Sequence, residues 1–218
     1  MTEHVGLGRL PAPDSRDAGY PLRAMVPATT DRTYRYWYSN GWWGDQGRTS
    51  QCVAYSWTHW LEDGPITHKG IAPIVEPASV YRDAQVVDEW PGENYNGTSV
   101  RAGAKVLADR GHIGEYRWAW DLETVVRALL DVGPVVVGTN WYSGMFEPNQ
   151  GIIDISGTVA GGHAYLLNGV NRNKGMIRLK NSWGRDWGSR GHAYISFEDM
   201  DRLIKEDGEA CLALEIGG

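Results

Sequence analysis

Four stretches of the chain repeat their hydrophobic residues with the spacing of an amphipathic helix. The first begins at residue 52 and stops before a Gly-Pro pair, and its hydrophobic face consists of Val53, Trp57, Trp60 and Leu61. Two further helices are predicted near residues 78–90 and 99–109. The run DLETVVRALLDVGP, with an acidic first turn and one apolar stripe, predicts the fourth.

After this fourth helix the pattern changes to short segments rich in β-branched residues and bounded by Gly or Asn. These segments are PVVVG, HAYLLNGV, GMIRLKNSW and HAYIS. Such runs are typical of an antiparallel sheet or barrel. Helices followed by strands predict an α+β fold with two lobes and a cleft between them. We expect one domain over 1–218, with an N-terminal extension (1–36), a helical lobe (about 37–116) and a β-rich lobe (about 117–218).

Composition and charge narrow the classes of partner. A hydrophobic content of 42%, with 11 Trp and 11 Tyr in 218 residues, supplies enough material for a core. The net charge of -6 gives no basic face for nucleic acid. Only VNRNKGMIRLKN is basic, and there Arg178 and Lys180 alternate with apolar residues. We interpret these two side chains as the solvated face of a strand.

The chain contains no run of eighteen apolar residues and no hydrophobic segment near its start. We therefore expect a cytoplasmic protein with no membrane partner. Its two cysteines, Cys52 and Cys211, are far apart in sequence and form no disulfide framework. Without a zinc motif, we expect no metal and no cofactor. Oligomeric state stays open.

The run GGHAYLLNGVNRNKGMIRLKNSWG predicts two strands joined by a turn at NRNKG. If Val170 pairs with Met176, Tyr165 lies opposite Asn181. His163 and Asn181 then become diagonal neighbours on one face of the hairpin, at roughly 5 to 8 Å. An imidazole beside an amide in this arrangement is an oriented base.

Cys52 stands directly ahead of the first predicted helix. A catalytic thiol needs a helix N-terminus or a cation, a base, and a group that fixes the tautomer of that base. Cys52, His163 and Asn181 could supply all three, and the pKa of Cys52 would then lie well below the ~8.5 of a free thiol. Taken singly, each residue fits ordinary core packing as well.

These residues resemble the papain family of cysteine peptidases. Gln46-Gly47 followed by Cys52 is similar to the family's Q-G-x-x-x-x-C segment, and GGHAYLLNGV is similar to its histidine strand. LKNSWGRDWGSRGHAYI is similar to the family's K-N-S-W-G-x-x-W-G-x-x-G run, which is highly specific. The resemblance implies a papain-like two-lobed fold, with a helical lobe, an antiparallel β-barrel lobe and the active site between them.

The resemblance also implies a cysteine endopeptidase that hydrolyses proteins or peptides through a thioester. Cys52 would be the nucleophile, His163 the general base and acid, Asn181 the residue that orients the imidazole, and Gln46 a donor to the oxyanion. Substrate-binding positions would be Ser50, Gln51, Gly97, Gly162 and Trp183. Trp183 would also shield the hydrogen bond between His163 and Asn181 from water.

The chain departs from the family pattern around the nucleophile, where T-S-Q-C-V replaces C-G-S-C-W. Ser50 takes the place of a glycine that usually lets a substrate backbone approach. The 51 residues that precede Cys52 are too few for the long inhibitory pro-segment of secreted members. Residues 1–36 are expected either to form a short inhibitory strap or to pack over the surface. Cys211 is expected to be a buried, slow thiol.

Other functions stay open at this stage. The same thiol chemistry could serve an amidase, a deamidase or an acyltransferase, because attack on an amide carbon does not define the substrate. A non-catalytic binding module with this fold is a third possibility.

Overall fold

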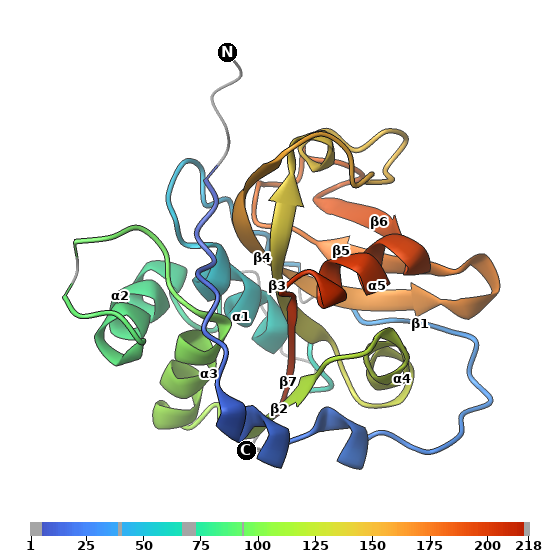
Figure 1. Ribbon diagram of the computed structural model, residues 1–218, viewed down its shortest axis with the longest axis horizontal. Coiled ribbons are helices and arrows are strands. Elements are labelled where there is room, and N and C mark those ends of the chain that lie inside the picture. Colours follow the sequence, from blue (N-terminus) through green and yellow to red (C-terminus); the bar gives the residue numbers. More distant parts are fainter. Residues whose placement is uncertain (1–5, 39–40, 67–72, 93, 216–218) are drawn as a thin grey trace.

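The computed structural model describes residues 6–38, 41–66, 73–92 and 94–215. Residues 1–5 of the predicted N-terminal extension and the last residue of the predicted strand CLALEI lie outside these ranges. Three helices lie together on one side of the molecule (Figure 1). They are α1 (Cys52–Asp63), α2 (Pro77–Val87) and α3 (Val100–Asp109). The helices predicted at 52, near 78–90 and at 99–109 are thus present, although α2 ends three residues early.

Tryptophan packing joins α1 to α3. Trp57 and Trp60 are fully buried in the core of the helices, and the Trp57 indole N–H donates to the Val100 carbonyl at 2.9 Å. Gly103 of α3 leaves room for this indole, because a Cβ there would lie 2.3 Å from Trp57 Cδ1. The close approach keeps α1, which begins at Cys52, in a defined position.

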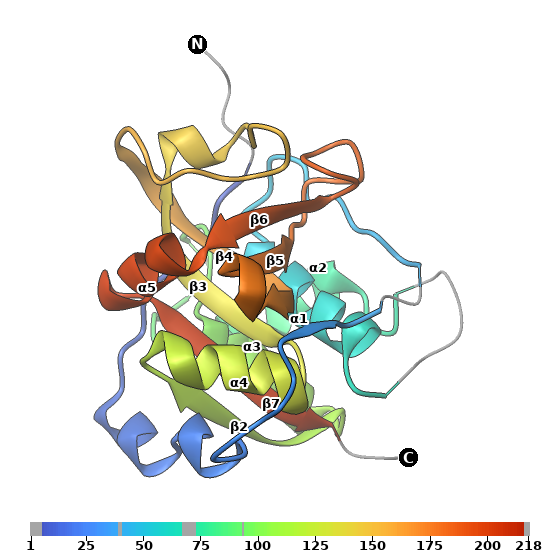
Figure 2. The ribbon, with the colours of Figure 1, turned by 90° about the vertical axis from the view of Figure 1, so that its right-hand side faces the viewer.

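A seven-stranded antiparallel sheet forms the other side of the molecule (Figures 1 and 2). Its strands are β1 (Tyr34–Tyr36), β2 (Ile113–Ala119), β3 (Val135–Tyr142), β4 (Val159–Asn171), β5 (Met176–Lys180), β6 (His192–Ser196) and β7 (Glu209–Glu215). The order is β2-β7-β3-β4-β5-β6, with β1 paired to β4. The predicted α+β fold is confirmed, although across the described residues the sheet is open at β2 and β6 and does not close into a full barrel.

Two helices pack against this sheet, α4 (Leu122–Asp131) and α5 (Phe197–Lys205). Their apolar residues share one core cluster with β3, β4 and β5. The sequence predicted α4 but not α5, although Ser196 caps α5 by accepting the Asp199 N–H at 3.0 Å. The cap lies at the last residue of β6, so the strand pattern obscured the start of the helix. Short 3-10 helices cover Ser15–Gly19, Leu22–Ala24, Ser143–Met145 and Arg172–Lys174.

The β4–β5 hairpin has two registers. Near the turn the predicted pairing is wrong by one residue, since Val170 pairs with Ile177. An irregularity between Leu167 and Gly169 then shifts the pairing, so that Leu166 faces Lys180 as predicted. The part of the hairpin that carries His163 therefore has the expected register, and the extra residue is Asn168.

The predicted solvated face of β5 is wrong. Lys180 is fully buried, and its Nζ lies 2.8 Å from Oδ1 of Asp63, which is buried at the end of α1. Asn168 donates to the second carboxylate oxygen of Asp63 at 2.7 Å and accepts from Arg178 Nε at 3.0 Å. Arg178 and Lys180 alternate with apolar residues because the face of β5 that carries them packs against the end of α1. There the carboxylate of Asp63 compensates the buried charge of Lys180.

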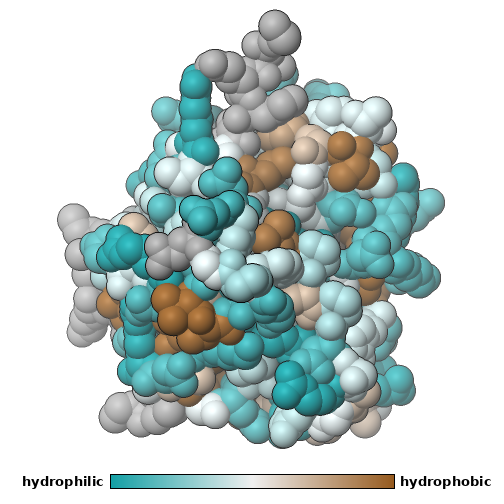
Figure 3. Space-filling model, turned by 60° about the vertical axis from the view of Figure 1, so that its left-hand side comes forward, coloured by the Kyte–Doolittle hydropathy of each residue, from teal (hydrophilic) through white to brown (hydrophobic). Residues whose placement is uncertain are grey.

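The surface in Figure 3 is a mosaic in which hydrophobic patches are separated by hydrophilic residues. In the described part of the chain, no helix is both long enough and apolar enough to cross a membrane. A cytoplasmic location stays a prediction, and so do the lobe boundaries.

Candidate active site

Cys52 is the first residue of α1, and its side chain is fully buried. Its Sγ accepts a hydrogen bond from the Ala164 N–H at 3.4 Å. Ala164 follows His163 directly in β4, so the thiol at the helix N-terminus lies against the strand that carries the histidine. Sequence-distant residues are brought together here by the packing of α1 on the sheet.

The hydrogen bonds of His163 define which ring nitrogen can act as a base. His163 Nε2 lies 2.8 Å from Asn181 Oδ1, and the same oxygen accepts the Ser182 N–H at 2.8 Å. Because an amide oxygen only accepts, Nε2 carries the proton. Nδ1 is then unprotonated, and it has no hydrogen-bond partner among the described residues. The imidazole thus has one fixed donor and one free acceptor.

Aromatic side chains enclose the His163 ring. Trp183 stacks on it with ring centroids 4.7 Å apart, and Trp141 contacts it edge-on at 4.8 Å. Phe146 in turn stacks on Trp183 with ring centroids 5.4 Å apart. Sequence reasoning singled out Trp183 but missed Trp141, which continues the period of two that begins in PVVVG.

Gln46 is held against the loop that follows Asn181. Its backbone N–H donates to the Ser182 carbonyl at 2.8 Å, and its Oε1 accepts from Ser182 Oγ at 2.5 Å. This pairing fixes the orientation of the side-chain amide. Its Nε2 donates to the carbonyls of Thr49 at 2.6 Å and Gly6 at 3.0 Å.

The N-terminal segment from Gly6 to Leu10, named here the strap, runs between the helices and β4 (Figure 1). The groove that the strap fills is bounded by Gly47 and Thr98 on one side and by Gly162 on the other. Its backbone pairs with both walls. The bonds are Gly6 N to Gly47 O (3.1 Å), Gly8 N to Gly162 O (3.0 Å), Leu10 N to Thr98 O (2.9 Å) and Thr98 N to Gly8 O (2.9 Å). The indole N–H of Trp183 also donates to the Gly6 carbonyl, at 3.3 Å. The hydrogen bonds place the strap between the helices and β4, and an inhibitory role of the extension stays a prediction.

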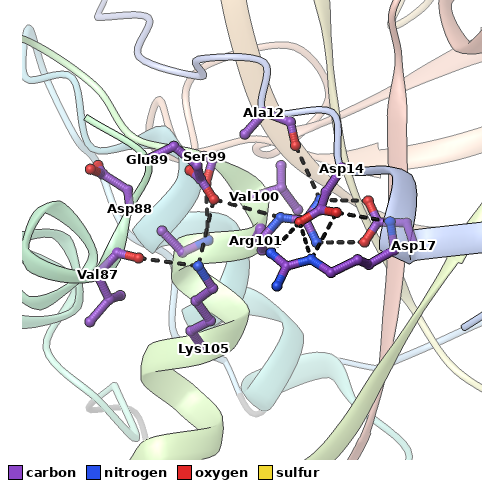
Figure 4. Close-up of polar contacts among 12 residues, drawn as sticks. Ala12, Asp14, Asp17, Val87, Asp88, Glu89, Ser99, Val100, Arg101 and Lys105 are labelled. Atoms are coloured by element: carbon purple, nitrogen blue, oxygen red, sulfur yellow. Dashed lines mark hydrogen bonds and ion pairs between the residues drawn. The ribbon is translucent and has the colours of Figure 1, made fainter. Parts of the chain in front are cut away.

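The chain just after the strap is fastened to α3. Figure 4 shows the guanidinium of Arg101 against the carboxylate of Asp17 and the carbonyl of Ala12. The contact to Ala12 measures 3.1 Å, and both Asp17 oxygens accept from Arg101. Such a bidentate, largely buried pair holds the segment in one register on the helix.

Four of the five predicted substrate-binding positions contact the strap. A Cβ on Gly162 would lie 2.1 Å from the Arg9 carbonyl oxygen, and a Cβ on Gly97 would lie 2.4 Å from that of Gly8. These contacts require glycine because the two backbones nearly touch. Trp183 donates to Gly6 as described, and Ser50 lies against Gly8.

Gln51, the fifth position, occupies the N-cap of α1. Its carbonyl accepts the Tyr55 N–H at 3.1 Å, so its backbone serves the helix.

Burial controls the protonation of the site in this covered state. Burial raises the pKa of Cys52 to about 12. This effect is larger than the opposite effect of the Ala164 and Val53 N–H groups, which lower the pKa. Burial lowers the pKa of His163 to about 4, against the raising effect of Asn181. The predicted low pKa of Cys52 is therefore wrong for the covered site, where the thiol and the imidazole are both neutral.

Cys211 of β7 is fully buried, as predicted, and burial raises its pKa well above the ordinary value. Both cysteines are free thiols. Only Cys52 lies beside a histidine strand and a helix N-terminus.

A family model described as papain family cysteine protease matches residues 78–209, more than half of the chain. The chain belongs to the papain family. The matched range includes His163 and Asn181 and begins after Cys52. This papain-family cysteine protease is a hydrolase of the thiol protease class.

Solved structures share the fold over most of their length. Xylellain, a cysteine protease from Xylella fastidiosa, has a TM-score of 0.77 at 19% identity, covering 98% of this chain and 97% of that one. Digestive procathepsin L 3 of Tenebrio molitor has a TM-score of 0.69 at 15% identity, and the match covers 96% of this chain and 75% of that one. Bromelain from Ananas comosus has a TM-score of 0.62 at 13% identity, and the match covers 85% of this chain and 100% of that one. No curated protein matches the chain.

Proposed function

We propose that this papain-family cysteine protease cleaves peptide bonds with Cys52 as nucleophile, His163 as general base and acid, and Asn181 as the residue that orients the imidazole. One observation carries the proposal. Cys52 Sγ accepts a hydrogen bond from the N–H of Ala164, the residue that follows His163. Nδ1 of His163 has no hydrogen-bond partner among the described residues. A base with a free acceptor beside a thiol is what proton transfer from that thiol requires.

The reaction follows from these groups. His163 Nδ1 takes the thiol proton, and Sγ forms a bond to the carbonyl carbon of the peptide. The tetrahedral intermediate collapses when the imidazolium protonates the amine and the C–N bond breaks, which leaves a thioester on Cys52. Water, deprotonated by His163, then attacks the thioester, and the C–S bond breaks to release the acid and the thiol.

The side-chain amide of Gln46 supports a role as oxyanion donor. Its Nε2 donates to the Gly6 carbonyl at 3.0 Å, and we take this carbonyl as the stand-in for the carbonyl oxygen of a substrate. Ser182 fixes the orientation of the Gln46 amide, so this donor does not need to reorient when negative charge develops on the substrate oxygen. Donors that are already oriented in this way stabilise the transition state.

A substrate can enter only after the strap leaves, because the strap occupies the groove and the Gln46 amide. Its departure admits water to Cys52 and His163, so the desolvation that now keeps both neutral is relieved. The helix N-terminus then favours the thiolate, and the negative charge of the thiolate in turn favours the imidazolium of His163. We therefore propose that the strap holds the enzyme inactive.

Family membership favours a peptidase over an amidase, a deamidase, an acyltransferase or a non-catalytic module. Protein or peptide is accordingly the proposed substrate class.

The test is alkylation by a peptidyl epoxide, followed by intact mass and peptide mapping. We expect one adduct, on Cys52, in the native chain and faster labelling in a chain carrying Gly8→Ala, which weakens the strap. Cys52→Ala should abolish both the adduct and casein hydrolysis, whereas Cys211→Ala should preserve both. Equal labelling of the two cysteines, or hydrolysis by Cys52→Ala, would overturn the proposal.

A further inference from the structure

Arg9 extends its side chain from the strap into a pocket beside the catalytic residues. Its backbone N–H donates to the Gly162 carbonyl at 3.1 Å, one residue before His163. The side chain is only 2% exposed; its Nε lies 3.0 Å from Glu209 Oε2, and its Nη2 lies 2.6 Å from the Asp207 carbonyl oxygen. The pocket holds a guanidinium through one charge and two directed hydrogen bonds.

The walls of this pocket are shaped for a long side chain. Gly138 of β3 pairs with Glu209 of β7, and a Cβ on Gly138 would lie 2.9 Å from both Arg9 Cγ and Val100 Cγ2. The absence of a side chain at Gly138 therefore makes the space for the aliphatic part of the arginine. Glu209 and Arg9 also line a cavity of about 580 Å³, together with Trp118, so the pocket continues beyond the guanidinium.

We propose that Glu209 is a specificity-determining residue, which makes the pocket select an arginine side chain of the peptide that replaces the strap. The inference rests on the proposed function, because a substrate must occupy the groove that the strap now fills. It assigns a substrate class, peptides with arginine at the position that enters this pocket.

Departure of the strap removes the charged partner of Glu209 and leaves it only the Ala12 N–H, which donates to Oε1 at 3.4 Å. The side chain of Glu209 is 12% exposed with Arg9 in place, and burial raises its pKa even beside that arginine. An unpaired carboxylate in such a site is costly, and a leucine in the pocket leaves it unpaired. The guanidinium of a substrate arginine would restore the contacts to the Glu209 carboxylate and the Asp207 carbonyl. The ammonium group of a lysine, which lacks the planar fork of a guanidinium, fits these two acceptors less well.

The experiment measures the rate at which peptidyl epoxides alkylate Cys52 in the full chain carrying Gly8→Ala. Arginine is first scanned along the peptide to find the residue that enters the pocket, and lysine and leucine are then compared at that position. We expect the arginine probe to alkylate Cys52 faster than the leucine probe by about 10- to 100-fold, because its guanidinium forms a charge pair with Glu209 in a desolvated site. Glu209→Gln should remove this preference, and Glu198→Gln, an exposed acid on α5, should keep it.

Glu209→Leu places no charge in the pocket and should favour the leucine probe, which keeps the test decisive if Glu209→Gln fails to fold. Equal rates for arginine and leucine at every position, or an arginine preference that survives both Glu209 variants, would overturn the inference. Turnover is a separate readout. Arginine-selective labelling without peptide hydrolysis would contradict the peptidase proposal and support the pocket, and absence of labelling by every probe would overturn both.

Discussion

At the scale of single residues, the two bonds that Asn181 Oδ1 accepts select the tautomer of His163. The indoles of Trp183 and Trp141 hold the same ring from two directions. Orientation is therefore shared between a hydrogen bond and packing. Proton transfer and covalent attack, in contrast, each depend on one side chain.

Asn181→Ala should consequently impair turnover far less than Cys52→Ala or His163→Ala. Losing Asn181 leaves a ring that the two tryptophans still restrain, whereas losing either of the others removes the acyl-enzyme route. The three act as a unit, so the losses should not add. The measurement is kcat/KM on a peptide substrate in the chain carrying Gly8→Ala. A loss on Asn181→Ala as large as that on His163→Ala would show that packing does not orient the ring.

Gln46→Ala should lower kcat by about 10²- to 10³-fold, because the donor acts on the oxyanion of the transition state. Alkylation of Cys52 by iodoacetamide, which develops no oxyanion, should persist. Gln85→Ala is the matched control, since Gln85 Nε2 also donates to a backbone carbonyl, that of Tyr95, at 3.1 Å. Equal losses of turnover and alkylation in Gln46→Ala would exclude the oxyanion role.

At the scale of elements, the strap is bound mainly through its backbone, and its glycines permit the close approach. A Cβ on Gly8 would lie 2.3 Å from the Ser50 carbonyl oxygen, whereas a Cβ on Gly19 of the same N-terminal segment would meet nothing within 4 Å. The same substitution to alanine should thus disturb the strap at Gly8 and have no effect on it at Gly19.

Gly8→Ala should accelerate alkylation of Cys52 by about 5- to 150-fold, the effect of 1 to 3 kcal/mol of overpacking on the closed state. Gly19→Ala should leave the rate unchanged. The readout is the pseudo-first-order labelling rate followed by mass spectrometry. Identical rates in the two variants would mean that the strap does not limit access to the thiol.

The buried pair of Lys180 and Asp63 joins β5 to the end of α1. Lys180→Met should reduce the free energy of unfolding by about 3 to 5 kcal/mol, because Asp63 is left as an uncompensated buried charge. Lys205→Met is the matched control, since Lys205 pairs with Asp201 on the surface of α5 with its side chain 70% exposed. There the expected loss is ~0 to 1 kcal/mol, measured by urea unfolding. Equal losses would argue that Lys180 is exposed in solution.

At the scale of the whole molecule, desolvation keeps three histidine rings neutral, of which His59 and His163 are buried and His192 is partly buried. Desolvation is the first cause in each case, and it lowers the pKa of His163 to about 4, that of His192 to about 3 and that of His59 well below 6.5. A folded pKa below the unfolded value means that protons bind preferentially to the unfolded chain. The stabilisation is complete above pH 6.5 and is lost as pH falls through the folded values.

The urea midpoint should therefore decline steadily from pH 6.5 to about 4, before most carboxylates titrate. Glu209, whose pKa burial raises, titrates in the opposite sense, so the decisive comparison is with His163→Asn, which should flatten the decline. A midpoint that stays constant between pH 7 and 4 in the native chain would contradict neutral burial of these rings.

The helix periodicity placed Cys52 at the start of α1, and the hairpin pattern placed His163 beside Asn181, because both arrangements depend on residues close in sequence. The motif around Asn181 was enough to indicate the family. The bulge at Asn168 lay beyond such reasoning, since one extra residue changes the register without altering the apolar alternation.

By itself, then, the sequence determined the helices, most strands and the identity of the candidate nucleophile, base and orienting amide, because these are written in local spacing and short motifs. Only the tertiary structure decided that the strap fills the groove, that Arg9 meets Glu209, and that Lys180 is buried. Arg9 with Glu209 and Lys180 with Asp63 join residues more than 100 positions apart, the strap also contacts residues far along the chain, and no period in the sequence encodes these contacts. The neutral state of Cys52 likewise follows from desolvation, which exists only once the chain is packed.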